Sequence, residues 1–168
     1  MPCPYLFPVP MWFFMITCYI FSLLSFAMLL IVFFQSIVPF KVVSASPLSF
    51  LILTSIIYLF TETLVMFFFV GTGVSVKEYM LEQKVHGDFH QRSIKIKRRI
   101  YPPQLLNILI LMIAFILFGA ADTHKIPAWV YQGTLLLGIL QFIDAKRIQN
   151  DCFRDNTKIV LDMAGIKR

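Results

Sequence analysis

Residues 11–34 read MWFFMITCYIFSLLSFAMLLIVFF, a long run without a charged side chain. A helix needs roughly 20 mainly apolar residues to cross the hydrocarbon core of a bilayer. The run exceeds this length and therefore predicts a transmembrane helix. It is longer than the apolar part of a cleaved signal, about 7–15 residues, and no positively charged segment precedes it, so we interpret it as a retained span.

The rest of the chain repeats this pattern. Of the 168 residues, 58% are hydrophobic and 14% are charged, and the mean hydropathy is +0.77. A soluble domain carries about 25% charged residues. We therefore predict an all-α integral membrane protein, residues 1–168 forming a single membrane domain. It would be an antiparallel bundle of four transmembrane helices with cytoplasmic helix extensions. The predicted spans are 11–34, 48–70, 105–121 and 126–143.

Positive charge predicts the orientation of the bundle. Of the 15 Lys and Arg residues, 13 fall in the predicted loop 71–104 and the predicted tail 144–168, whereas the opposite side holds only Lys41 and Lys125. Basic residues remain on the cytoplasmic side of a membrane. We therefore expect both termini in the cytoplasm, and we take the membrane to be a bacterial inner membrane. Topology and attraction to anionic lipids explain the net charge of +6, so no nucleic-acid partner is predicted.

The polar segments suggest local structure and contacts. We expect the second helix to extend into the cytoplasm. Residues 93–103, SIKIKRRIYPP, alternate apolar and basic side chains, which favours an extended segment lying on the membrane surface. In the tail we expect the fourth helix to continue and a short separate helix to follow, starting at Asp155 or Asn156 and ending at Gly165. The residues predicted to contact lipid headgroups or a partner are Lys95, Lys97, Arg98 and Arg99.

One acid, Glu62, lies inside the second predicted span, in the stretch 59–69, LFTETLVMFFF. A charge at the centre of a transmembrane helix costs about 2.5–3.5 kcal/mol on insertion scales, so Glu62 should face protein or water. Ser55 and Tyr58 share its helix face. Because no Lys or Arg lies within a predicted span, we expect Glu62 to have no ion-pair partner in the chain. Polar side chains available to bond it are Asn107, Tyr131, Gln132, Thr134 and Gln141.

Two interpretations of Glu62 remain open. It is either a hydrogen-bonding group between helices or a functional carboxyl that is proton-coupled, faces a ligand or lines a quinone pocket. The first is favoured because no chain of further acids accompanies it. A second cluster, Glu78, Glu82, His86 and His90, has a spacing of four that would stack these residues on one helix. Glu82, His86 and His90 are candidate ligands for Zn or Fe, although a solvated charged face is the favoured alternative.

Three functions are compatible with these patterns. The favoured one is a non-catalytic accessory or structural subunit of a larger membrane complex, such as a respiratory or other energy-converting assembly. Its partners would be other integral membrane subunits and anionic lipids. The first alternative is a small four-helix proton-coupled transporter or flippase using Glu62. The second is a membrane metal or redox module using Glu82, His86 and His90. We predict no catalytic residue and no cofactor except bound lipids.

Overall fold

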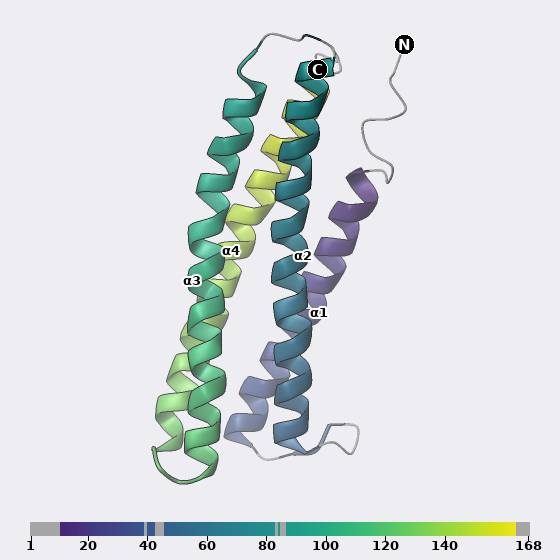
Figure 1. The fold of residues 1–168 in the computed structure, drawn as a ribbon. Coiled ribbons are helices and arrows are strands. Elements are labelled where there is room, and N and C mark those ends of the chain that lie inside the picture. The colour runs from purple at the N-terminus through teal and green to yellow at the C-terminus, as the bar shows by residue number, and fades with distance from the viewer. Residues whose placement is uncertain (1–10, 39, 43–45, 83, 85–86, 164–168) are drawn as a thin grey trace.

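The computed structural model describes the chain except residues 1–10, 39, 43–45, 83, 85–86 and 164–168. Its helices are α1 (Met11–Ile37), α2 (Pro47–Glu82), α3 (Phe89–Asp122) and α4 (Ala128–Met163). Consecutive helices run antiparallel, so the start of α1 and the end of α4 lie at the same end of the bundle (Figure 1). The prediction of an all-α protein is confirmed for the described residues, which form these four long helices.

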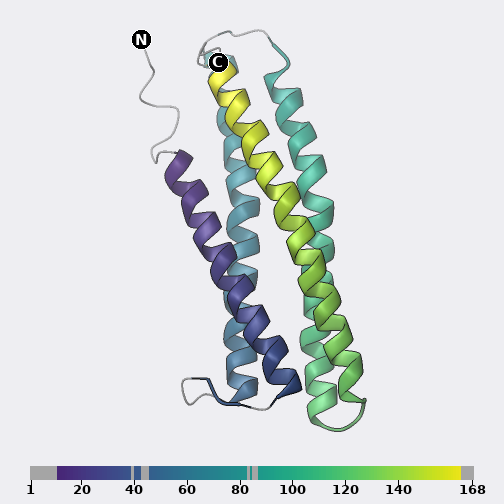
Figure 2. The same ribbon diagram turned by 180° about the vertical axis from the view of Figure 1, so that it is seen from behind.

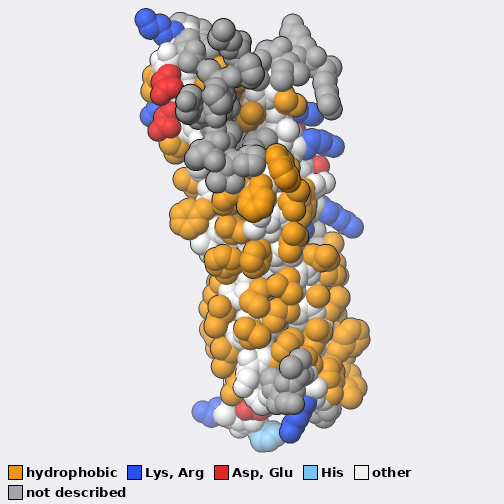
Figure 3. Space-filling view, turned by 90° about the vertical axis from the view of Figure 1, so that its right-hand side faces the viewer, with side chains coloured by type: hydrophobic (Ala, Val, Ile, Leu, Met, Phe, Trp, Pro, Cys, Tyr) orange, Lys and Arg blue, Asp and Glu red, His pale blue; other side chains and the backbone are white. Residues whose placement is uncertain are grey.

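Three of these helices, α1, α2 and α3, are long and apolar enough to cross a membrane. Hydrophobic side chains cover the middle of the face in Figure 3, and charged side chains gather toward its two ends. This distribution is that of a protein whose middle is surrounded by lipid. The uncharged part of α4 is shorter, because it ends where Asp144 follows Ile143.

The closest helix pair is α3 with α4. A short connection, 123–127, joins them, and the two helices lie side by side in both ribbon views (Figures 1 and 2). Gly138 of α4 permits this approach: a Cβ atom there would lie 2.5 Å from Cδ2 of Leu111 on α3. In contrast, α1 packs mainly on α2 and touches α4 less, which leaves the α1–α4 side the more open one.

The buried apolar residues form two clusters along the bundle. The cluster nearer the α3–α4 connection includes Leu111, Leu135 and Phe142. The other lies toward the termini of the bundle and includes Val65 and Phe153. Polar side chains from α2, α3 and α4 meet between them, at the level of the candidate site.

The expected extended segment at 93–103 is wrong, because α3 begins at Phe89 and runs through it. The buried residues Ser93, Ile96, Ile100 and Gln104 recur every three or four positions, which is a helical pattern. The alternation of apolar and basic residues in this segment concealed that pattern. Pro102 and Pro103 lie inside the helix; packed neighbours make such prolines tolerable in membrane helices.

The expected separate helix in the tail is also wrong. Helix α4 continues without a break to Met163, and Asp155 and Asn156 lie inside it. Its buried side chains Cys152, Asn156, Ile159 and Met163 keep the three-and-four spacing that packs α4 against its neighbours. Tertiary packing therefore overrides the capping pattern that suggested a new helix. Gly165 is outside the described residues.

Candidate functional site

Glu62 is at the centre of a buried polar contact among three helices. The residue is 1% exposed. Gln104 of α3 donates from Nε2 to Oε2 of Glu62 over 2.6 Å and to the Glu62 backbone carbonyl over 3.2 Å. Lys146 of α4 places Nζ 2.7 Å from Oε1. We call Glu62, Gln104 and Lys146 the Glu62 cluster; it joins α2 to α3 and α4.

The expectation that Glu62 has no ion-pair partner in the chain is therefore wrong. Lys146 follows the predicted fourth span, but α4 continues as a helix and carries it inward. Helices α2 and α4 start at the same end of the bundle (Figure 1). With the rise of an α-helix, Glu62 lies about 22 Å along α2 from Pro47 and Lys146 about 27 Å along α4 from Ala128. Glu62 and Lys146 therefore lie at similar heights in the bundle, which allows their charges to meet.

Lys146 makes contacts on several sides. Its approach to Oε1 of Glu62 is an ion pair without the alignment of a hydrogen bond, so the attraction is chiefly between charges. The ammonium also donates to Oε1 of Gln149 over 2.8 Å and lies 4.8 Å from the centre of the Phe142 ring. Its side chain keeps 17% exposure. Glu62 is thus closed off from the surroundings of the protein, whereas Lys146 remains partly accessible from outside.

Further polar contacts tie the helices together near this cluster. Asn107 of α3 donates to the Tyr58 hydroxyl over 2.9 Å, and the hydroxyls of Ser25 and Thr61 lie 2.8 Å apart between α1 and α2. Ser55 instead donates to the carbonyl of Leu51 within α2. Of the predicted polar face, Tyr58 and Glu62 bond to other helices, whereas Ser55 bonds to its own.

Three other residues proposed as partners of Glu62 contact other groups. Gln132 donates to the backbone carbonyl of Ser36, which joins α4 to α1, and Thr134 donates to the carbonyl of Val130. Tyr131 is buried in the apolar cluster. Gln104 was missed because it precedes the predicted third span. Its position one turn before Asn107 was the available signal, since residues three apart share a helix face.

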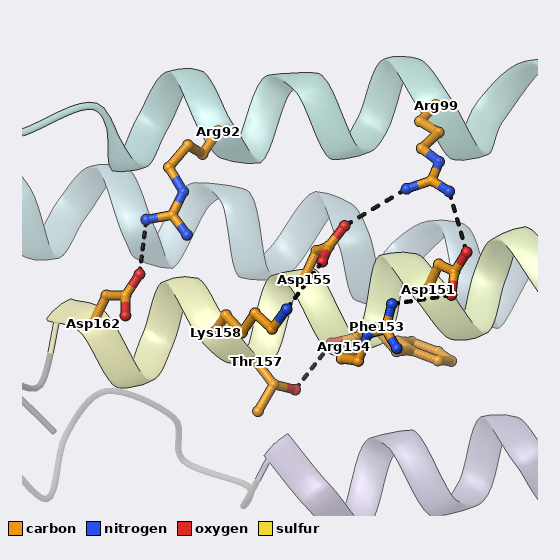
Figure 4. A network of polar contacts seen from close by, with 9 residues as sticks. All are labelled: Arg92, Arg99, Asp151, Phe153, Arg154, Asp155, Thr157, Lys158 and Asp162. Carbon is orange, nitrogen blue, oxygen red and sulfur yellow. Dashed lines mark hydrogen bonds and ion pairs between the residues drawn. The ribbon is translucent and has the colours of Figure 1, made fainter. Parts of the chain in front are cut away.

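The basic segment 95–99 does not act as one surface. Arg99 reaches Asp151 at 3.1 Å and Asp155 at 3.6 Å, both on α4 (Figure 4). Together with the ion pair of Arg92 and Asp162 at 2.8 Å, these contacts join the polar ends of α3 and α4. The surroundings of the other predicted contact residues, Lys95, Lys97 and Arg98, differ from those of Arg99.

Each of those three has its own surroundings. Lys97 lies across Gly73 of α2, where an added Cβ would collide with the lysine side chain. Lys95 lines a cavity of about 190 Å³ with Arg92 and Lys158, among others. Arg98 is exposed and forms no ion pair with any described residue. Lys95 and Arg98 are therefore exposed, whereas Lys97 is half-buried against α2.

The proposed metal ligands do not stack on one helix. Helix α2 ends at Glu82, and His90 lies in the first turn of α3, after the chain has reversed direction. His86 lies outside the described residues. Within the described part of the chain, no three His, Cys, Asp or Glu residues come together in a group suited to a metal ion.

A groove opens beside the Glu62 cluster, between α1 and α4, with a volume of about 540 Å³. Lys146 belongs both to this groove and to the cluster. The groove lining is Tyr19, Ser22, Leu23 and Phe26 from α1 and Phe142, Ile143, Lys146, Arg147 and Asn150 from α4. The arrangement offers donors and positive charge at one edge of an apolar surface.

No family model, curated protein or solved structure matches this chain.

Proposed function

We propose that the chain is a non-catalytic structural subunit of a larger integral membrane complex. The Glu62 cluster supports this role, because both carboxylate oxygens are held by side chains of other helices. A carboxylate fixed in this way stabilises the bundle. The inner polar groups of α2, α3 and α4 thus position the helices, and the outer faces are available for other subunits.

The observation that carries the proposal is the exposed apolar face of α2. Phe67, Val70, Val74 and Leu81 are 67%, 44%, 48% and 70% exposed, and their spacing places them on one side of the helix. With the rise of an α-helix, Val74 and Leu81 lie about 40 and about 51 Å along α2 from Pro47. The hydrocarbon core of a bilayer is only about 30 Å thick.

Lipid tails therefore do not account for the far end of this face. Exposed apolar surface outside the bilayer is typical of a protein interaction site. The exposed charged residues Lys77 and Glu78 flank it, as polar residues flank the apolar centre of an interface. We infer that a second membrane subunit packs along α2 and continues past the membrane boundary.

The topology completes the proposal. We propose that α4 is a fourth span, since it lies antiparallel beside α3 and exposes Trp129, Leu136, Leu137 and Leu140. Both termini would then be cytoplasmic, because most basic residues lie at the end of the bundle where α1 starts and α4 ends. A bacterial inner membrane is the location that we propose.

The test is photocrosslinking in the native membrane. A photoreactive amino acid at Val74 or Leu81 should capture one defined protein partner. The matched control is Ile116, which is 69% exposed on α3 within the apolar region and should capture lipid. Capture of no protein from either α2 position, or the same mixture from all three positions, would refute the docking face.

A proton-coupled transporter is the second candidate. The observation in its favour is that Lys146 connects Glu62 to the α1–α4 groove. A transporter whose cycle protonates Glu62 should lose proton-coupled uptake in reconstituted vesicles when Glu62→Gln is made, while the fold survives. A structural subunit shows no such uptake in the wild-type protein.

A further inference from the structure

The α1–α4 groove combines an apolar wall with a charged edge. Leu23, Phe26, Phe142 and Ile143 form the wall, and the rings of Phe26 and Phe142 stack across the two helices with centroids 6.0 Å apart. Lys146 and Arg147 lie one turn further along α4 and form the charged edge. An amphiphilic molecule with a negative head matches this division.

The two cations retain capacity for a ligand. A lysine ammonium has three N–H donors. Glu62 and Gln149 occupy two sides of Lys146, so one donor remains for the groove. Arg147 is exposed and forms no ion pair with any described residue. Because Glu62 balances the charge of Lys146, the net positive charge of the groove comes from Arg147.

A buried hydroxyl without a partner also indicates that a ligand occupies the groove. Ser22 lines the groove and is 8% exposed, yet its Oγ has no hydrogen-bond partner among the described residues. A buried polar group without a partner is destabilising, and a ligand oxygen in the groove would satisfy it. Nearby, the Tyr19 hydroxyl donates to Oδ1 of Asn150, which joins α1 to α4 at the polar end.

The height of the charged edge identifies the environment. Lys146 and Arg147 lie about 27–29 Å along α4 from the external end of the bundle, near the thickness of one hydrocarbon core. In the proposed topology, lipid phosphates lie at that level on the cytoplasmic side. The apolar wall extends from there toward the bilayer centre, along the path of an acyl chain.

We propose that the α1–α4 groove binds one anionic phospholipid of the cytoplasmic leaflet. Arg147 and the free donor of Lys146 hold its phosphate, and an acyl chain covers Phe26 and Phe142. The headgroup must carry net negative charge, because a zwitterionic lipid presents its own cation beside the phosphate. This site is separate from the proposed partner face on α2. It rests on the proposed topology and does not depend on the subunit role.

Native mass spectrometry of the purified protein tests the site. The protein is equilibrated with equal amounts of phosphatidylglycerol and phosphatidylcholine in mild detergent. The wild type should retain one phosphatidylglycerol molecule in preference to phosphatidylcholine. Arg147→Gln should weaken its retention about tenfold, the effect of losing a charge-assisted hydrogen bond. The control Arg98→Gln makes the same change at an exposed position on α3 and should leave retention within about twofold.

A second variant tests the apolar wall. Leu23 is 70% exposed on the rim, so Leu23→Trp should block the acyl chain without disturbing the core or the two cations. Retention of phosphatidylglycerol should fall in this variant as well, with an unchanged thermal unfolding midpoint.

Three results would overturn the proposal. The first is equal retention of both lipids by the wild type. The second is equal loss in Arg147→Gln and Arg98→Gln, which would indicate general surface charge. The third is binding of inorganic phosphate alone with the same dependence on Arg147, which would make the ligand a free ion.

Discussion

Replacing Lys146 with Met removes the charge that faces Glu62 while keeping a long apolar stem. Glu62 is 1% exposed, so the variant leaves a carboxylate in the interior with only Gln104 to stabilise it. Breaking a buried ion pair by removing one partner costs about 3–5 kcal/mol. Since Lys146 itself is 17% exposed, we expect the lower part of this range, about 3 kcal/mol.

Removing both charges should restore part of the stability that Lys146→Met loses. In Glu62→Gln the side-chain amide oxygen can still accept from Gln104, and Lys146 keeps its bond to Gln149. We expect this variant to lose about 1–2 kcal/mol. The double variant Glu62→Gln/Lys146→Met should be no less stable than Lys146→Met alone, with a coupling energy of about 2–3 kcal/mol between the two sites.

The assay is reversible unfolding in mixed micelles of mild detergent and dodecyl sulfate, followed by tryptophan fluorescence. All four proteins of the cycle are measured under one condition, so that the unfolded-state reference is shared. A Lys146→Met variant within about 0.5 kcal/mol of the wild type would refute the reasoning. Strictly additive single variants would also contradict it, because the two side chains would then not interact.

Three further predictions concern other contacts. Gly138→Ala should destabilise the α3–α4 hairpin by about 1–3 kcal/mol in the same assay. Gly133→Ala should not destabilise it, because a Cβ atom added there has no neighbour within 4 Å. Equal effects of the two substitutions would contradict the close approach of α3 and α4. Arg99→Gln should cost about 0.5–1 kcal/mol and less at high salt, against no change for Arg98→Gln, and a salt-independent loss would point away from the ion pairs. Burial raises the pKa of the Cys152 thiol to about 11 from an ordinary value of 9.0. The folded protein therefore holds a proton that the unfolded chain loses between pH 9 and 11, so stability should fall with pH more steeply in the wild type than in Cys152→Ala.

The sequence predicted the helices well where long uncharged runs dominate. Met11–Ile37 is such a run, and its length alone predicts a helix. Prediction was wrong in two polar segments, 93–103 and the separate tail helix, because hydropathy carries no information about a helix that continues outside the membrane. The expected continuation of the second helix beyond residue 70 is confirmed as far as Glu82. Ile96 and Ile100 are buried four residues apart, but the intervening Lys97, Arg98 and Arg99 and the following prolines suggested an end to regular structure.

The sequence predicted only part of the candidate site, again because hydropathy carries little information about polar segments. Glu62 was identified from its charge in an apolar run, and Tyr58 from its shared helix face. Gln104 and Lys146 were missed because both lie just outside predicted spans, where polar residues are common. Residues counted along α3 and α4 from their connection, and along α2 from its start, would have placed Gln104 and Lys146 near the height of Glu62. Which face each helix turns inward, however, depends on packing among all four.

The most direct test of the central claim is native mass spectrometry of the protein extracted from its own membrane, beside the double variant Val74→Asp/Leu81→Asp. We predict that the wild type carries at least one other integral membrane subunit in fixed stoichiometry, and that the variant folds but loses it. A wild-type protein that is recovered alone or only as a homodimer would contradict the structural-subunit account.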